Sequence, residues 1–552
     1  MKCNGGKAVV EVLREEGVRK VFFVPGESFL SVLDAFYDTP EIETISARHE
    51  GGAAFMAEGY AKASGEVGVC MATRGVGSAN LAIGIHTAQQ DSTPMVALIG
   101  QIDRPYKGKE AFQEVDLVSF FSHLCKWTVE IDSAERIPEL LQRAFHIARS
   151  GRPGPVLVAL PEDMLTDTTE IKVNKPIRLR PAPPDVESVK EAAEKLVNAN
   201  RPVIIAGGGV LKSMATQPLI QLAEELQIPV VTAFRRFDAF PNSHPNYIGS
   251  LGLSTPAYLL DYIKKADAVL GLGTRFSQIT TQDYTLLTDN ANLIHVDVSP
   301  DVIGKVHTPS LAIAADVNEF LKHLLPIIEA NNNPTRKQLV STLHEKYIVY
   351  STPKQDYQVD YVDMDGMIYD FIQNIPKDSI ITTDAGNFYS WLSRYYRFEQ
   401  AGTFLGPTSG AMGYGLPSAI GAKLAHPTQP VISFSGDGGF MMTMQEIETA
   451  VRYNIPVISI VVNNNMYGTI RMHQEKHFPN RVVGTELTNP SFAKMAQLFG
   501  GHGEKVEKNI DFIPALQRAL SAKCPALIEV MTNSLILSAN QAKPMKEANH
   551  LN

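Results

Sequence analysis

The sequence has few cysteines, no long apolar run and no concentration of basic residues. Its four cysteines, Cys3, Cys70, Cys125 and Cys524, are scattered singly. They form no CxxC pair, so neither a disulfide framework nor a zinc site is expected. The longest apolar runs, such as 457–462, are strand-length and fall far short of the roughly 20 residues that span a bilayer. No transmembrane segment is predicted.

The charge balance excludes further classes. Fifty Lys and Arg stand against 59 Asp and Glu, which gives a net charge of −9 over 552 residues. No stretch gathers the basic residues that phosphate neutralisation needs, so we expect neither a nucleic-acid binder nor a membrane-surface protein. The N-terminus runs directly into an amphipathic stretch and lacks the apolar core of a signal peptide. Because the scattered cysteines fit a reducing compartment, the sequence predicts a cytoplasmic protein.

Short β-branched runs alternate with helix-length periodic segments along nearly the whole chain. This pattern is typical of parallel sheets covered by helices on both faces, so the predicted fold class is α/β, with three doubly wound parallel-sheet domains. Strands are predicted at 21–24, 67–73, 95–99, 156–160, 203–206, 229–232, 268–272, 293–298, 380–383, 431–435, 457–462 and 526–530.

Two stretches have the composition of linkers. Lys175–Asp185 contains four prolines, and Ala330–Pro353 begins with an Asn-Asn-Asn-Pro break. Such segments favour extended or turn conformations over regular structure. The sequence therefore predicts domains at 1–174, 186–330 and 354–552.

The same order of sequence elements occurs in the first and in the third domain. Each has a segment rich in Gly and Ala, at 50–61 and 409–422, followed by similar strands. Helices with so many small residues pack closely against a sheet or a ligand. We interpret the two domains as related copies. The alternative is that any two α/β domains look alike at this level of detail.

The strongest local motif is Gly-Asp-Gly-Gly-Phe at 436–440, directly after a predicted strand. Asn464 follows the next predicted strand and lies 27 residues after Asp437. A strand, a helix and a second parallel strand fill about this length, which places both side chains at the carboxyl edge of one sheet. Oxygen ligands of this kind suit Mg²⁺ bound together with phosphates. The alternative is a tight turn whose Asp caps the following helix.

Glu50, in Arg-His-Glu at 48–50, opens the small-residue helix of the first domain. A glutamate at a helix start commonly interacts with the helix dipole and does nothing else. The functional alternative is a shielded carboxyl that donates and accepts a proton.

Together these motifs resemble the thiamine-diphosphate-dependent family that includes acetolactate synthase, pyruvate oxidase and the 2-oxo acid decarboxylases, and most of all its acetolactate synthase large-subunit branch. The resemblance covers essentially the whole chain. It is also carried by VPGE at 24–27, RGVGSAN at 74–80, HTAQQDSTP at 86–94, EAFQE at 110–114, RPGP at 152–155 and GYGLP at 413–417. It implies pyrimidine-binding, central Rossmann-like and diphosphate-binding domains, with thiamine diphosphate and Mg²⁺ as cofactors.

The resemblance also implies roles for single residues. Mg²⁺ would be bound by Asp437, Asn464 and the backbone carbonyl of Met466. The groups around the diphosphate would be Gly386, Asn387, Gly438 and Gly439.

The rest of the cofactor would be held by three further residues. The carbonyl of Gly410 would accept from the exocyclic amine, and Met412 would hold the cofactor in a bent, strained conformer. Glu50 would contact the pyrimidine ring and promote loss of the reactive thiazolium proton. In the family, the Glu50 side and the Asp437 side come from different subunits. A homodimer or homotetramer with active sites at the subunit interface is therefore implied.

The resemblance leaves more than one reaction open. The substrate would be a small 2-oxo acid, and Phe112 and Gln113 match residues that line the substrate side in acetolactate synthases, which favours carboligation to a second carbonyl. A decarboxylase or lyase that releases an aldehyde ranks second, because the His-His pair of pyruvate-decarboxylase-like proteins is missing. A non-catalytic nucleotide-binding scaffold is the alternative from another class.

The sequence departs from the acetolactate synthase pattern at three places, which bear on the substrate and on FAD. Glu162 stands where the synthases typically have Lys, and His473 stands where anabolic synthases have a selecting Trp. Together with Arg471, His473 could bind a polar group of the substrate, or both could lie on a solvated helix face. The central domain has glycines after two strands, at 207–209 and 273, but lacks the Asp-Asp-Arg that usually follows in FAD-binding synthases. FAD is therefore an option that the sequence does not select.

Overall fold

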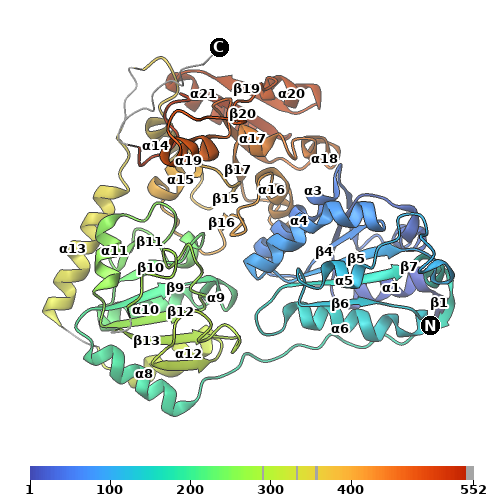
Figure 1. Ribbon diagram of the computed structural model, residues 1–552, viewed down its shortest axis with the longest axis horizontal. Coiled ribbons are helices and arrows are strands. Elements are labelled where there is room, and N and C mark those ends of the chain that lie inside the picture. Colours follow the sequence, from blue (N-terminus) through green and yellow to red (C-terminus); the bar gives the residue numbers. More distant parts are fainter. Residues whose placement is uncertain (289–290, 331–332, 355–358, 542–552) are drawn as a thin grey trace.

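The computed structural model describes residues 1–288, 291–330, 333–354 and 359–541. Within these residues the chain forms three six-stranded parallel sheets and one two-stranded antiparallel pair. Figure 1 shows three domains, each with helices on both sides of its sheet. The predicted α/β class is confirmed.

The N-terminal sheet has the strand order β3-β2-β4-β5-β7-β6. Its strands are β2 (Lys20–Phe23), β3 (Glu43–Ser46), β4 (Gly68–Ala72), β5 (Met95–Gln101), β6 (Trp127–Glu130) and β7 (Pro155–Pro161). Its helices are α1 (Gly5–Glu15), α2 (Leu30–Tyr37), α3 (Glu50–Ser64), α4 (Gly75–Asp91), α5 (Leu117–Phe121), α6 (Ile137–Arg149) and α7 (Glu162–Thr166). The antiparallel pair joins β1 (Lys2–Asn4) to β8 (Thr168–Glu170).

The central sheet has the order β11-β10-β9-β12-β13-β14. Its strands are β9 (Pro202–Ala206), β10 (Val230–Thr232), β11 (Tyr247–Ser250), β12 (Ala268–Leu272), β13 (Asn292–Asp297) and β14 (Leu311–Ala314). Its helices are α8 (Val186–Asn198), α9 (Gly208–Lys212), α10 (Thr216–Leu226), α11 (Ala257–Lys264), α12 (Val317–Leu324) and α13 (Pro334–Tyr350).

The C-terminal sheet has the order β16-β15-β17-β18-β20-β19. Its strands are β15 (Ile380–Thr383), β16 (Phe404–Leu405), β17 (Val431–Gly436), β18 (Ile458–Asn463), β19 (His502–Val506) and β20 (Ala526–Met531). Its helices are α14 (Met364–Asn374), α15 (Tyr389–Tyr395), α16 (Gly415–Ala425), α17 (Asp437–Phe440), α18 (Glu446–Arg452), α19 (Gly468–His477), α20 (Phe492–Leu498) and α21 (Asn509–Ser521).

Helix α13 corrects one prediction from the sequence. The composition of 330–353 predicts a linker, but residues 334–350 form a helix that packs on the central domain. Arg336 is almost fully buried and donates to the carbonyls of Leu196 and Leu226, and the ring of Tyr347 packs edge-on against Tyr247. In the part of the chain that the structure describes, no helix is both long and apolar enough to cross a membrane.

The first and third domains meet along helices α3 and α16, which lie side by side in Figure 1. A side chain at Gly421 would collide with the carbonyl oxygen of Met56, and one at Gly59 would come within 2.5 Å of the carbonyl oxygen of Ser418. The two helices therefore touch backbone to backbone, which only glycine allows. One hydrophobic cluster continues across this contact, from Phe55 to Ile420.

All three domains converge on the carboxylate of Asp91, at the end of α4. It pairs with Lys62 at 2.7 Å and with Arg236 of the central domain at 3.0 Å. The hydroxyl of Thr408, in the C-terminal domain, donates to it at 2.7 Å. The Asp91 side chain is fully buried. This junction fixes how the domains sit relative to one another.

Replacing Asp91 with Asn is expected to destabilise the protein by about 3–5 kcal/mol, because Arg236 would lose its buried carboxylate and Lys62 would keep only that of Glu58. Burial opposes ionisation of Asp91, but Lys62 and Arg236 hold its pKa below the usual range. The stabilisation is therefore present above about pH 4 and is lost as the pH falls further. Denaturant unfolding at pH 7 measures the effect. Asn at the exposed Asp34 is the control, and equal unfolding midpoints for the two variants would contradict the expectation.

Candidate active site

Polar side chains meet at the carboxyl edge of the C-terminal sheet, where the adjacent strands β17 and β18 end. Asp437 follows β17 directly, and Asn463 is the last residue of β18. The side-chain amide of Asn489 donates to Asp437 at 2.7 Å and to Asn463 at 3.1 Å. The sequence predicted the meeting of these two strand ends. It did not identify Asn489, whose Asn-Pro turn signals a loop without naming its partner.

Asp437 is 2% exposed, and burial raises the pKa of its carboxyl to about 6, although the hydrogen bond from Asn489 acts in the opposite direction. A buried carboxylate with a raised pKa lacks a compensating positive charge. A cation placed at this edge would supply that charge. The donor chemistry therefore fits Mg²⁺, which prefers carboxylate, amide and carbonyl oxygens.

The other two predicted metal ligands lie in the turn that follows β18. The side-chain oxygen of Asn464 accepts from the backbone N–H of Met466 at 3.3 Å. The carbonyl of Met466 accepts from Gly468 at 2.9 Å. The backbone N–H of Met466 also interacts with the Asp437 carboxylate, so the structure brings all three predicted ligands to one sheet edge.

The four residues predicted to surround a diphosphate gather at the same edge. A side chain at Gly438 would come within 2.5 Å of the Tyr467 ring, and one at Gly439 within 2.7 Å of Asp384. The backbone N–H of Asn387, which follows Gly386, donates to the Thr469 hydroxyl at the start of α19. The glycines at 438 and 439 are therefore required by the protein's own packing, in addition to any ligand. Two short helices, α17 and α18, fill the connection between β17 and β18.

Gly410 and Met412 lie on a loop beside this edge. The carbonyl of Ala411, between them, accepts from the backbone N–H of Ala385 at 3.2 Å, which places the loop next to Gly386. Gly410 has a φ of 74°, and the space where a side chain would extend is open. The structure thus combines an open space at Gly410 with a half-buried Met412.

The N-terminal domain supplies a second set of residues at the start of α4. Glu50, the first residue of α3, is half-buried and accepts from the side-chain amide of Asn80 at 3.0 Å. The carbonyl of Gln113 accepts from the backbone N–H of Gly75, the first residue of α4. Gly77, in the same turn of α4, lies against the Glu50 carboxylate. Phe112 is 75% exposed. Glu50 and Gln113 therefore share one end of a helix, while Phe112 projects into solvent.

The structure changes the interpretation of Glu162. Its carboxylate forms an ion pair with Arg74, the residue before α4. The negative charge expected from the replacement of Lys by Glu is therefore neutralised within the chain. Arg74 opens the RGVGSAN motif but was given no role from the sequence, and it places a positive charge on this side of the site.

Arg471 and His473 do not converge. Arg471 is 4% exposed and pairs with Glu475 on the same helix at 3.1 Å. His473 is exposed, and its ring stacks on that of His477. His473 therefore lies on the solvated face of α19, as one of the two interpretations expected. Arg471 lies on the buried face of the same helix.

The space beside the glycines at 207–209 of the central domain is occupied by other residues of the chain. Side chains at Gly207 and Gly209 would collide with Gly273, and the Nε atom of Arg236 lies 2.9 Å from where a side chain at Gly208 would begin. The space above this strand end therefore holds an arginine whose guanidinium is bound to Asp91. These residues do not fit the close approach of a dinucleotide.

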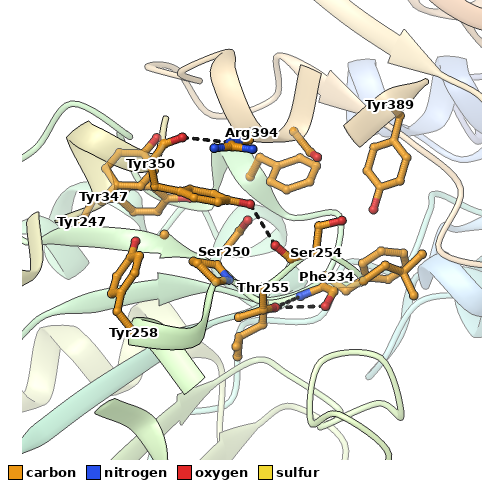
Figure 2. Close-up of a pocket in the computed structure, with 17 residues that line it drawn as sticks. Phe234, Tyr247, Ser250, Ser254, Thr255, Tyr258, Tyr347, Tyr350, Tyr389 and Arg394 are labelled. Carbon is orange, nitrogen blue, oxygen red and sulfur yellow. Dashed lines mark hydrogen bonds between the residues drawn. The ribbon is translucent and has the colours of Figure 1, made fainter. Parts of the chain in front are cut away.

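A cavity between the central and C-terminal domains is lined by aromatic rings (Figure 2). Arg394 donates to the carbonyl of Tyr350, and the Tyr350 hydroxyl donates to the carbonyl of Ser254. The cavity volume is about 30 Å³. Ligand pockets are roughly ten times larger or more, so this cavity has room for water only.

Comparisons with known proteins agree with this arrangement. Three family models match the chain: thiamine pyrophosphate enzyme, N-terminal TPP binding domain, at residues 3–120; central domain, at 189–324; and C-terminal TPP binding domain, at 384–530. The chain is 34% identical to a probable acetolactate synthase large subunit of Methanocaldococcus jannaschii, covering 98% of this chain and 93% of that protein.

Two further relatives show the same extent of similarity. The large subunit of acetolactate synthase isozyme 1 from Escherichia coli is 34% identical, covering 96% of this chain and 94% of its own. The acetolactate synthase large subunit of Cyanidium caldarium is 32% identical, covering 95% and 92%. From end to end, this chain belongs to the thiamine pyrophosphate enzyme family.

Proposed function

We propose that the protein is an acetolactate synthase-like enzyme that uses thiamine diphosphate and Mg²⁺ to decarboxylate a 2-oxo acid and join the product to a second carbonyl. The observation that carries this proposal is the buried Asp437 carboxylate, gathered with amide oxygens at one sheet edge. Burial raises the pKa of this carboxyl to about 6, and a cation bound with the cofactor would favour its charged form.

The C-terminal domain would hold the charged end of the cofactor. Asp437, Asn464 and the carbonyl of Met466 would bind Mg²⁺, and the loops at 386–387 and 438–439 would surround the diphosphate. Gly410 and Met412 would border the ring system. When bound, thiamine diphosphate supplies a carbon nucleophile and an electron sink for decarboxylation.

The N-terminal domain would control a proton. Glu50 would face the pyrimidine ring nitrogen and hold a proton there, while Asn80 keeps the carboxylate in place. Phe112 and Gln113 would border the substrate, with Arg74 close to Gln113 in the fold. A carboxyl in this position gains its effect from shielding and orientation.

The complete site would need a second copy of the chain, which supports a homodimer or homotetramer with active sites at the subunit interface. A cytoplasmic location remains part of the proposal. Glu50 is half-buried in the single chain. On the neighbouring helix α4, Val76 is 56% exposed and Ile83 is 44% exposed, seven residues apart and so on one face. A partner's C-terminal domain packed there would bury this apolar face and shield Glu50.

The experiment is cofactor-dependent CO₂ release from a panel of 2-oxo acids, followed by identification of the product. We expect a hydroxyketo acid. An aldehyde as the main product would show a simple decarboxylase instead. If no 2-oxo acid releases CO₂ in the presence of thiamine diphosphate and Mg²⁺, the proposed activity is wrong.

In the central domain, Arg236 occupies the space at the end of β9, where a flavin nucleotide would approach. This leads to a prediction about FAD. We expect the purified protein to be colourless and to leave flavin fluorescence unchanged when FAD is added at micromolar concentration, because Arg236 lies across Gly208. Absorption spectra and a fluorescence titration measure this. A yellow protein with one flavin per chain would contradict the prediction.

A further inference from the structure

Glu446, the first residue of α18, reaches from the C-terminal domain to the helix that carries Glu50. Its side chain is fully buried. Both carboxylate oxygens lie 3.2 Å from the backbone nitrogen of Arg48, two residues before Glu50. A side chain at Gly52 would collide with the same carboxylate. Glu446 therefore binds the backbone just before α3 and lies against the first turn of this helix.

The chemistry of this contact suits a helix start. The N-terminal turn of the 15-residue helix α3 presents unpaired N–H groups and a partial positive charge, which favour a carboxylate. The Thr449 hydroxyl donates to the same carboxylate at 2.7 Å and fixes its orientation. Burial raises the pKa of Glu446 to about 7, while the hydrogen bonds from Thr449, Arg48 and His49 lower it.

The opposite end of α3 is held by the same domain with the opposite polarity. The Nε2 atom of His426, which follows α16, lies 2.9 Å from the carbonyl oxygen of Ala63 in the last turn of α3. As a donor, this imidazole satisfies a carbonyl at the negative end of the helix. The two ends are therefore held alike, but only one of them carries Glu50.

We propose that Glu446 is a positioning residue, which fixes the first turn of α3 and thereby the direction of the Glu50 carboxylate. The proposal rests on the proposed function, since it assumes that Glu50 acts on the cofactor. Glu446 itself lies nine residues after Asp437 in the chain, and it touches the backbone beside Glu50 instead of any reacting group. Its effect would be on orientation, to which catalytic rates are sensitive.

The test compares Glu446→Gln and Glu446→Ala with the matched variant His426→Ala. Hydrogen exchange of the peptide covering residues 46–54 is expected to be faster in Glu446→Ala, and exchange at 60–66 faster in His426→Ala. With thiamine diphosphate and Mg²⁺ saturating, we expect kcat to fall about 10- to 100-fold in both Glu446 variants, with KM within twofold. The kcat of His426→Ala is expected to stay within twofold of the wild type.

The outcomes separate three cases. If the Glu446 variants exchange faster at 46–54 but retain kcat, Glu446 is an anchor between domains and the proposal is wrong. If exchange at 46–54 is unchanged in Glu446→Ala, the contact does not hold the helix start, and the proposal is wrong for that reason. If the wild type releases no CO₂, it is the proposed function that fails, while the exchange data still show whether Glu446 holds the turn.

Discussion

Replacing Glu50 with Gln is expected to lower cofactor-dependent CO₂ release about 10²- to 10⁴-fold, the range typical for the loss of a positioned proton-transfer group. The amide is nearly the same size and can still accept from Asn80, which now donates to the Glu50 carboxylate at 3.0 Å. It cannot hold or release a proton at the pyrimidine ring. The binding of thiamine diphosphate is expected to weaken far less than the rate. Initial rates at saturating cofactor measure the effect.

The control for Glu50→Gln is Glu15→Gln, an exposed position at the end of α1 on the same domain. Its rate is expected to equal that of the wild type. Equal rates for wild type and Glu50→Gln would show that this carboxyl takes no part in the reaction. In that case the helix-dipole interpretation of Glu50 would be the correct one.

Replacing Asp437 with Ala is expected to weaken the Mg²⁺-dependent binding of thiamine diphosphate about 100-fold or more, since even residues that only support a metal ligand commonly contribute 10- to 100-fold. The unliganded protein is not expected to lose stability. Its fold raises the pKa of this carboxyl to about 6, so the charged form is disfavoured until a cation arrives. The variant should therefore keep its unfolding temperature but lose the increase that cofactor gives the wild type.

Quenching of tryptophan fluorescence follows cofactor binding directly, because Trp391 lies on α15, shortly after the predicted diphosphate loop at 386–387. The control is Asp511→Ala, an exposed acid at the start of α21 in the same domain. A variant at Asp437 that binds cofactor as tightly as the wild type would remove Asp437 from the metal site.

The strands of the fold that could be predicted from the sequence are the inner ones. All twelve predicted strands are present, including the fully buried β5 and β7. The strands that were missed in the three large sheets are their six edges, β3, β6, β11, β14, β16 and β19. An edge strand has a neighbour on one side only and carries polar residues, as in β6, where every residue is partly exposed. Strand β6 therefore lacks the continuous apolar run that reveals an inner strand, whereas β16 is only two residues long and β14 alternates buried and exposed residues.

The same limit applies to the candidate site. Asp437 and Asn464 follow strands and share one sheet edge, so their proximity could be derived from strand order alone. Asn489 and Glu446 act through contacts made 52 and 398 residues away in sequence, with Asp437 and Arg48. No local pattern encodes such a contact. The adjacent glycines 51 and 52 do indicate that something approaches the start of α3, without saying what.

The backbone contact between α3 and α16 also determines which parts of the molecule can move. The two helices meet backbone to backbone, with Gly421 against Met56 and Gly59 against Ser418, so sliding one helix along the other would bring larger residues into these close contacts. We therefore expect the first and third domains of one chain to behave as a single rigid body. The motions that admit a substrate and release a product would then belong to exposed segments such as 108–115 and α19, and not to a hinge between these domains.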